Sequence, residues 1–188
     1  MWNNFKNKKI NSNRNGFTII ELVISIFILS VAIIGAYNAF TTMDILTSNS
    51  TDRLVGAYLA QEGIEIVRNI RDTNWLEGED WQTGLIDCES GCEADYKTFG
   101  DYATPLVLWA DGNYLYSDSD GFYSYDINPS DKPKFKRKIV IEPIQTAGGE
   151  DDVMRVEVTV FWNQKSNLLF ASSENNLIIV EEFLYNWY

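Results

Sequence analysis

The chain of 188 residues has few side chains that could perform chemistry, because it contains no histidine and only two cysteines. Without an imidazole, Ser-His-Asp and Cys-His hydrolases are excluded, as is a zinc site with histidine ligands. Two cysteines are also too few for an all-cysteine zinc site. The remaining candidates are the cysteine pair, two groups of acidic residues and one isolated glutamate.

Cys88 and Cys92 are separated by three residues, Glu-Ser-Gly. A redox Cys-x-x-Cys motif has two intervening residues, and a metal site would need further ligands. In a domain outside the cytoplasm such a pair predicts a disulfide, with free thiols as the alternative. The closed loop is so short that the disulfide is expected to fix a local corner rather than the whole domain.

Two groups of acidic residues could perform chemistry, but acidic turns are the better explanation of both. Glu150, Asp151 and Asp152 follow a Gly-Gly pair, and paired carboxylates perform glycoside hydrolysis, but acidic hairpin loops are common. Asp118 and Asp120 alternate before Gly121, as in a calcium loop. The twelve-residue pattern with a closing glutamate is missing, which favours an Asp/Ser/Gly turn over a calcium site.

Glu21 is the only charged residue in an apolar run that covers residues 17–40. As a helix this run would be roughly 36 Å long, enough to cross a bilayer core of about 30 Å. The preceding sixteen residues carry four basic side chains and no acid, which predicts an N-terminus on the cytoplasmic side. A charge within hydrocarbon is costly, so Glu21 is a candidate functional residue.

The sequence around this glutamate, Gly16-Phe17-Thr18-Ile19-Ile20-Glu21-Leu22, resembles the processing site of the type IV prepilin family, which includes pilins and pseudopilins. In that family prepilin peptidase cleaves after the glycine and methylates the new N-terminal phenylalanine. The resemblance implies cleavage between Gly16 and Phe17, methylation of Phe17, and Glu21 as the fifth residue of the mature chain.

Glu21 would then lie near the new α-amine, which needs a counter-ion when it is buried among helices. In the family this glutamate is thought to neutralise the amine of a neighbouring subunit, which sets the register of assembly. A glutamate that snorkels to the membrane interface is the alternative interpretation. An ordinary secretory signal is a further alternative, because Ser30-Val31-Ala32 offers small residues for a cut before Ile33.

The rest of the chain predicts an α+β fold. One long helix is expected over residues 17–72, with a stripe of Gly56, Leu59, Ala60, Gly63, Ile66, Val67 and Ile70 and an ion pair between Glu65 and Arg68. Its glycines suggest mild bends. Residues 74–105 read as a connecting region. Strands are expected at 106–109, 113–116, 122–126, 135–142, 153–163 and 177–186, forming an antiparallel sheet that packs on the helix, as in pilins.

The charge is unevenly distributed. The net charge is −12, which argues against a nucleic-acid partner, although residues 132–138 form a basic strip of Lys132, Lys134, Lys136, Arg137 and Lys138. This strip is interpreted as a solvated edge strand, with a contact to a neighbouring subunit or to DNA as alternatives. Copies of so acidic a domain would repel one another, which favours a minor pilin or pseudopilin over a major pilin.

These features predict a structural subunit rather than an enzyme, with no cofactor. The expected parts are a leader at 1–16, a membrane and assembly segment at 17–44, an amphipathic helix at 45–73 and a globular domain at 74–188. The expected partners are prepilin peptidase, other pilin or pseudopilin subunits, an inner-membrane assembly platform and membrane lipid before assembly. The expected location is the cytoplasmic membrane and then an extracytoplasmic filament. The alternative is a signal-anchored or secreted binding module or carboxylate-dependent hydrolase.

Overall fold

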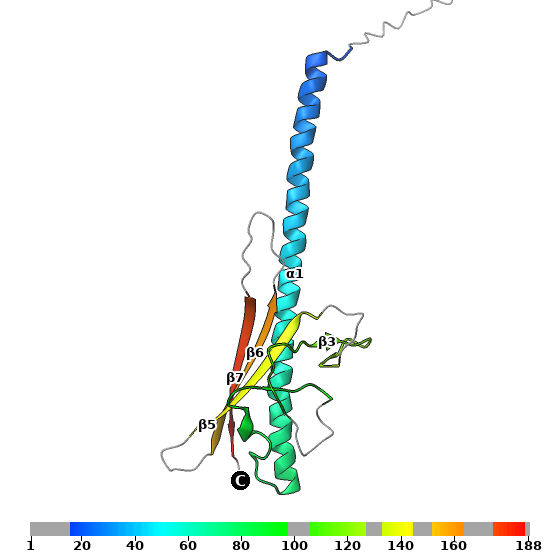
Figure 1. Ribbon diagram of the computed structural model, residues 1–188. Coiled ribbons are helices and arrows are strands. Elements are labelled where there is room, and N and C mark those ends of the chain that lie inside the picture. The colour runs from blue at the N-terminus through cyan, green and yellow to red at the C-terminus, as the bar shows by residue number, and fades with distance from the viewer. Residues whose placement is uncertain (1–15, 98–105, 127–132, 145–151, 164–174, 187–188) are drawn as a thin grey trace, which may run out of the picture. The chain divides into compact units, whose positions relative to one another are not determined.

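The computed structural model describes residues 16–97, 106–126, 133–144, 152–163 and 175–186. The chain divides into two units, the first ending at Met43 and the second beginning at Asp44. A single helix, α1 (Ile19–Glu77), contributes to both (Figure 1). In the first unit the described residues form the apolar half of α1. The second unit contains the other half of α1 and every strand among the described residues.

The second unit is an antiparallel sheet packed on a helix, so the predicted α+β fold is confirmed. The sheet has the order β2-β1-β5-β6-β7, and β3 and β4 form a separate hairpin. The elements after α1 are the 3-10 helix η1 (Ile86–Cys88) and the strands β1 (Cys92–Glu93), β2 (Val107–Leu108), β3 (Tyr116–Ser117), β4 (Tyr123–Ser124), β5 (Phe135–Ile144), β6 (Val153–Asn163) and β7 (Asn175–Tyr185). Figure 1 shows β5, β6 and β7 running beside the second half of α1.

α1 ends five residues later than the sequence predicted, at a glycine. Gly78 has a φ of +78°, and its amide donates to Trp75 O while the Glu79 amide donates to Asn74 O. These two hydrogen bonds form a Schellman motif, which satisfies carbonyls that the helix end leaves without partners. The glycine just after a helical stretch was the available signal for this end.

The predicted apolar stripe of α1 is confirmed as the face that packs on the sheet. Leu59, Ala60, Ile66 and Val67 are buried, and they face Val156, Val158 and Val160 of β6, which are fully buried. The ion pair between Glu65 and Arg68 is also present. The core therefore lies between one face of β5 and β6 and one stripe of the helix.

Gly56 and Gly63 bring α1 close to β6, a role that differs from the bends suggested by the sequence. A Cβ atom at Gly63 would lie 2.8 Å from Val158 Cγ1, and one at Gly56 would lie 3.0 Å from Trp162. Side chains at these positions would push the helix away from the sheet. The absence of a side chain thus permits the close packing of the core.

The interpretation of the basic strip as an edge strand is wrong. β5 lies inside the sheet, between β1 and β6. Along it Arg137 faces the helix and is 1% exposed, whereas Lys136 and Lys138 lie on the opposite face. The alternation of a strand separates charges that are adjacent in sequence. Lys132 lies outside the described residues.

β1 was not predicted, because it consists of two residues within a segment without periodicity. Cys92 pairs with both Leu108 of β2 and Ile139 of β5, so this short strand joins β2 to the sheet. The predicted strands at 153–163 and 135–142 correspond to β6 and β5. The three short aromatic runs form strands of only two residues each, which are shorter than expected. The pairing of β2 with β1 and that of β3 with β4 each extend over two residues.

Candidate functional site

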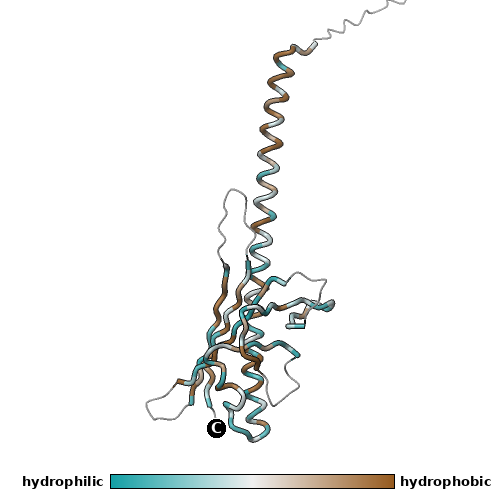
Figure 2. The backbone as a smooth tube through the Cα atoms, in the orientation of Figure 1, coloured by the Kyte–Doolittle hydropathy of each residue, from teal (hydrophilic) through white to brown (hydrophobic). Residues whose placement is uncertain are grey.

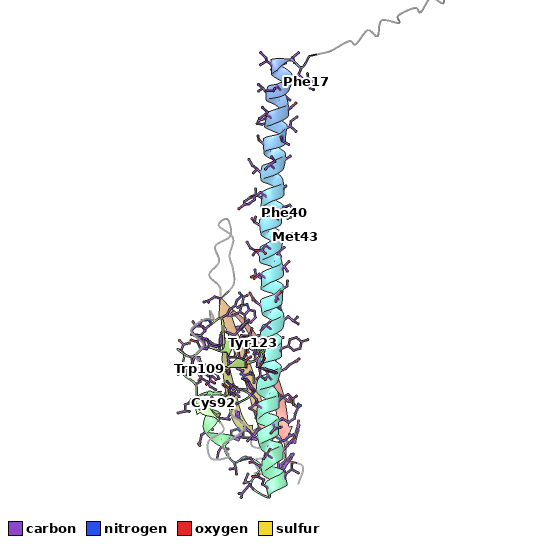
Figure 3. All side chains as sticks on the ribbon, turned by 90° about the vertical axis from the view of Figure 1, so that its right-hand side faces the viewer. Phe17, Phe40, Met43, Cys92, Trp109 and Tyr123 are labelled. Carbon is purple, nitrogen blue, oxygen red and sulfur yellow. A yellow bond between two sulfur atoms is a disulfide. The ribbon has the colours of Figure 1, made fainter. Side chains whose placement is uncertain are left out.

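The N-terminus of α1 holds the predicted processing and assembly residues. Gly16 and Phe17 precede the helix, and Phe17 is exposed at its start (Figure 3). Thr18 is the N-cap: its Oγ1 accepts a hydrogen bond from the Glu21 amide at 3.3 Å, and its carbonyl accepts one from the Leu22 amide. The pattern Thr-x-x-Glu is a capping-box signature, so the sequence contained a signal for this helix start that the prediction did not use.

Glu21 lies in the first turn of α1, where the helix dipole favours a negative charge. No other charged residue occurs between residues 17 and 43. Among the residues that the structure describes, no cation pairs with its carboxylate, which is exposed. Within the described residues the carboxylate of Glu21 is thus left without a counter-ion.

The first half of α1 has an apolar surface on all sides. Every described residue from 16 to 40 is exposed, including Ile19 at 86% and Phe27 at 68%. Figure 2 shows this part of the helix as mostly hydrophobic. By length and composition α1 can cross a membrane, a property that some signal sequences share. So much apolar surface requires lipid or other helices to cover it.

Polar side chains in this half bond to their own helix. Ser25 Oγ donates to Glu21 O and Ser30 Oγ donates to Ile26 O, each at 2.7 Å, and Thr42 Oγ1 donates to Asn38 O at 2.9 Å. Hydroxyls that are satisfied in this way do not need water. Glu21 is therefore the one side chain of this half whose charge demands a partner from elsewhere.

Cys88 and Cys92 form a disulfide in the globular unit. Both are buried, and they belong to the main core together with Leu85 and Ile139. Gly91, with a φ of +107°, makes the turn between them, and its carbonyl accepts a hydrogen bond from the Trp109 amide. The disulfide closes a short loop as expected, and it joins the end of η1 to the first residue of β1 within the core.

The Asp118 and Asp120 segment is a hydrogen-bonded turn. Asp118 Oδ1 accepts from the amides of Asp120 and Phe122, and its Oδ2 accepts from Tyr96 OH, all at 2.9 Å. Desolvation opposes the ionisation of Asp118, but these hydrogen bonds outweigh it and lower the pKa of Asp118 below its usual value. Both oxygens of Asp118 thus hold the turn that the sequence favoured over a calcium site.

The acidic group proposed as a hydrolase alternative falls largely outside the described residues. Glu150 and Asp151 are not described, and Asp152 is described next to β6, where its carbonyl accepts a hydrogen bond from the Asn186 amide. Within the described parts of the chain, His, Cys, Asp and Glu side chains form no group of three that could hold a metal ion.

The comparisons with known proteins concern the N-terminal segment. Residues 11–37 match the family model described as the prokaryotic N-terminal methylation motif. No curated protein and no solved structure shows a significant match to the chain. The matched residues include the predicted cleavage position and Glu21, and the apolar helix leads into a helix packed on an antiparallel sheet. The chain therefore carries the prepilin-type N-terminal methylation motif and has a pilin-like architecture, with a long N-terminal helix packed on an antiparallel sheet.

Proposed function

We propose that this protein is a minor pilin or pseudopilin that is cleaved after Gly16, methylated on Phe17 and assembled into a filament through the first half of α1. Pilin-like proteins are typically structural subunits, and the protein acts here as a substrate of prepilin peptidase rather than as an enzyme. Before assembly the apolar half of α1 lies in the cytoplasmic membrane with its basic leader inside. The globular unit lies outside the cytoplasm.

One observation supports the proposal above the others: the apolar half of α1 is exposed throughout and carries a single charge, Glu21, in its first turn. Lipid can cover the apolar side chains before assembly, and neighbouring helices can cover them afterwards. Cleavage supplies a new amine at Phe17, four residues before Glu21. An amine from the same or a neighbouring subunit would then neutralise the carboxylate among packed helices.

A minor role fits the acidity of the chain, whose 27 acidic residues exceed its 15 basic residues. Identical acidic domains repel one another at close range, so a filament of this subunit alone is disfavoured. Other pilin or pseudopilin subunits and an inner-membrane assembly platform are the partners that this role requires.

Mass spectrometry of the protein purified from its own cells tests the processing step. The expected N-terminus is methylated Phe17, and deletion of the prepilin peptidase should leave the leader attached. An uncut chain in the presence of the peptidase, or a chain that starts at Ile33, would contradict the proposal and indicate a signal anchor or a secretory signal.

The substitution Glu21→Gln tests the assembly step. It removes the charge and keeps the size of the side chain, so we expect normal cleavage and membrane insertion with at least tenfold less protein in sheared filaments. Loss of one partner of a buried ion pair costs about 3–5 kcal/mol, enough for this effect. Thr18→Ala is the control, because it weakens the helix cap by about 1 kcal/mol without changing the charge. Normal assembly of the Glu21 variant would refute the role of Glu21.

A further inference from the structure

A pocket of about 370 Å³ lies in the globular unit, where the end of β6 meets the segment after β2. Its lining includes Trp109, Asp111, Tyr114, Lys136, Phe161 and Asn163. Phe161 and Asn163 come from β6 and Lys136 from β5, so rigid strands form one wall. The segment from Trp109 to Tyr114 forms the other wall. The volume falls in the range of sites for small ligands.

The wall from Trp109 to Tyr114 is held by a buried carboxylate. Glu93 is 3% exposed, and its two oxygens accept hydrogen bonds from the Ala110 amide at 2.9 Å and from Asn113 Nδ2 at 2.8 Å. The Trp109 amide bonds to Gly91 O, beside the disulfide. A buried acid that anchors a short polar turn fixes its shape before any ligand arrives, which lowers the entropic cost of binding.

The pocket combines aromatic rings with short polar groups. Trp109, Tyr114 and Phe161 are partly exposed. Lys136 lies over the Tyr114 ring, with its Nζ 4.7 Å from the ring centre, and Lys138 lies over the Trp109 ring, so the Phe161 ring and the uncovered faces of the other two offer stacking surface. Asp111 and Asn163 are exposed and offer hydrogen-bonding groups at the rim. A pyranose ring has the matching chemistry, with one face of C–H groups and a rim of hydroxyls. Rings can stack on the C–H face, and carboxylate, amide and ammonium groups can bond to the hydroxyls.

The charges of the pocket favour a neutral saccharide over an anion. Both lysines that line it are paired, Lys136 with Asp111 at 3.1 Å and Lys134 with Asp52. An anion would have to compete with these carboxylates. One further cation, Lys138, lies next to the pocket with its Nζ 5.1 Å from the centre of the Trp109 ring, so an acidic saccharide is the ligand class to test against.

We infer that this pocket binds a neutral oligosaccharide. Phe161, together with Trp109 and Tyr114 of the opposite wall, stacks on a sugar ring. Asp111 accepts hydrogen bonds from the sugar hydroxyls at the rim, and Asn163 accepts or donates them. This inference goes beyond the proposed function, because every residue involved belongs to the globular unit and none to the processing site. It would place a glycan-binding surface on the exposed part of the subunit.

Isothermal titration of the full chain tests the inference, with triacetylchitotriose, cellotriose and maltotriose as neutral probes and trigalacturonate as the acidic probe. The detergent must be non-glycosidic, such as an alkyl amine oxide, because alkyl maltosides would compete. We expect at least one neutral probe to bind with a Kd of about 1 mM or lower. No binding of the neutral probes at about 10 mM, or binding of trigalacturonate alone, would overturn the inference.

Two pairs of variants connect binding to the pocket. Asp111→Ala should weaken binding about tenfold, whereas Asp126→Ala, which removes an equally exposed acid paired with Lys97, should not. Phe161→Leu should weaken it about threefold to tenfold, whereas Phe183→Leu on β7 should not. Near-ultraviolet circular dichroism confirms the fold of each variant. Equal loss in a pocket variant and its control would contradict the assignment.

Discussion

The two halves of α1 share one continuous helical backbone but satisfy opposite requirements. In the first half every residue from 16 to 40 is exposed, and the hydroxyls bond within the helix. In the second half a stripe that includes Leu59, Ala60 and Val67 is buried against the sheet. Helical geometry alone therefore says little about function. The distribution of apolar side chains around the helix separates a half that needs outside partners from a half that has its own.

Charge follows the same division. Glu21 has no cation beside it among the described residues, whereas several charges of the second half, among them Glu62 and Arg68, have partners within the chain. Arg137 of β5, the partner of Glu62, has a fully buried side chain and connects three segments. Its Nη1 donates to Leu59 O at 2.9 Å and pairs with Glu62 at 3.2 Å, and its Nη2 donates to Ala94 O. The charge of Arg137 therefore gains its partners when the globular unit folds. Under the proposed function, Glu21 gains its partner only on assembly.

The largest expected effect comes from breaking this internal pairing. Arg137→Met should lower the free energy of unfolding by about 3–5 kcal/mol, because it leaves Glu62 and two buried carbonyls without their donor. Denaturant titration of the full chain in detergent, followed by tryptophan fluorescence, measures the change. Filament assembly should fail only as a consequence of unfolding.

Arg155→Met is the matched control for this prediction. Arg155 lies on the opposite face of the sheet, with 31% of its side chain exposed, and pairs with Glu142, Glu157 and Glu181. Partly exposed ion pairs contribute little, so the loss should be below about 1 kcal/mol. Equal losses for the two arginines would show that burial between helix and sheet does not set the importance of Arg137.

The sequence predicted the elements with strong periodicity and missed those defined by single contacts. The alternation of Val156, Val158 and Val160 and the stripe of α1 were sufficient for β6 and the packed helix face. The predicted disulfide is present, but its place in the core depends on β1, a strand of two residues that no period could indicate. Arg137 was interpreted as solvated because it stands among other basic residues. In such a run the alternation of inward and outward side chains along the strand cannot be recognised from residue type.

The N-terminal methylation motif could be recognised in the sequence for a different reason. Gly16, Phe17 and Glu21 lie within a short local pattern whose meaning does not depend on long-range contacts, and residues 11–37 match the methylation motif. The saccharide pocket had no such pattern. Trp109, Phe161 and Asn163 are far apart in the sequence, and only the pairing of strands brings them together. Local signals therefore indicated assembly, and tertiary structure was needed to find a binding surface.

Gly→Ala substitutions in the two halves of α1 should sharpen the comparison. At Gly63 the new Cβ would lie 2.8 Å from Val158 Cγ1, so overpacking should exceed the gain in helix propensity and cost about 1 kcal/mol net. At Gly35 nothing lies within 4 Å of the Cβ position, so unfolding of the globular unit should be unchanged. Denaturant titrations compare the two variants. A loss at Gly35 equal to that at Gly63 would show that the first half also has close partners within the chain.

The smallest expected effect is a pH dependence that belongs to the globular half, at the Asp118 turn. Hydrogen bonds to the ionised carboxylate lower the pKa of Asp118, so the folded state binds a proton less readily than the unfolded state. This contribution to stability is present above the usual aspartate pKa of 3.8 and is lost as the pH falls through the lowered value. Asp118→Asn should therefore flatten the fall in melting temperature below about pH 4, since an amide does not titrate there.

Asp120→Asn is the control, because the Asp120 carboxylate accepts none of the hydrogen bonds that hold this described turn. If both variants keep the wild-type profile in acid, the turn is held by its backbone alone and Tyr96 adds nothing through Asp118.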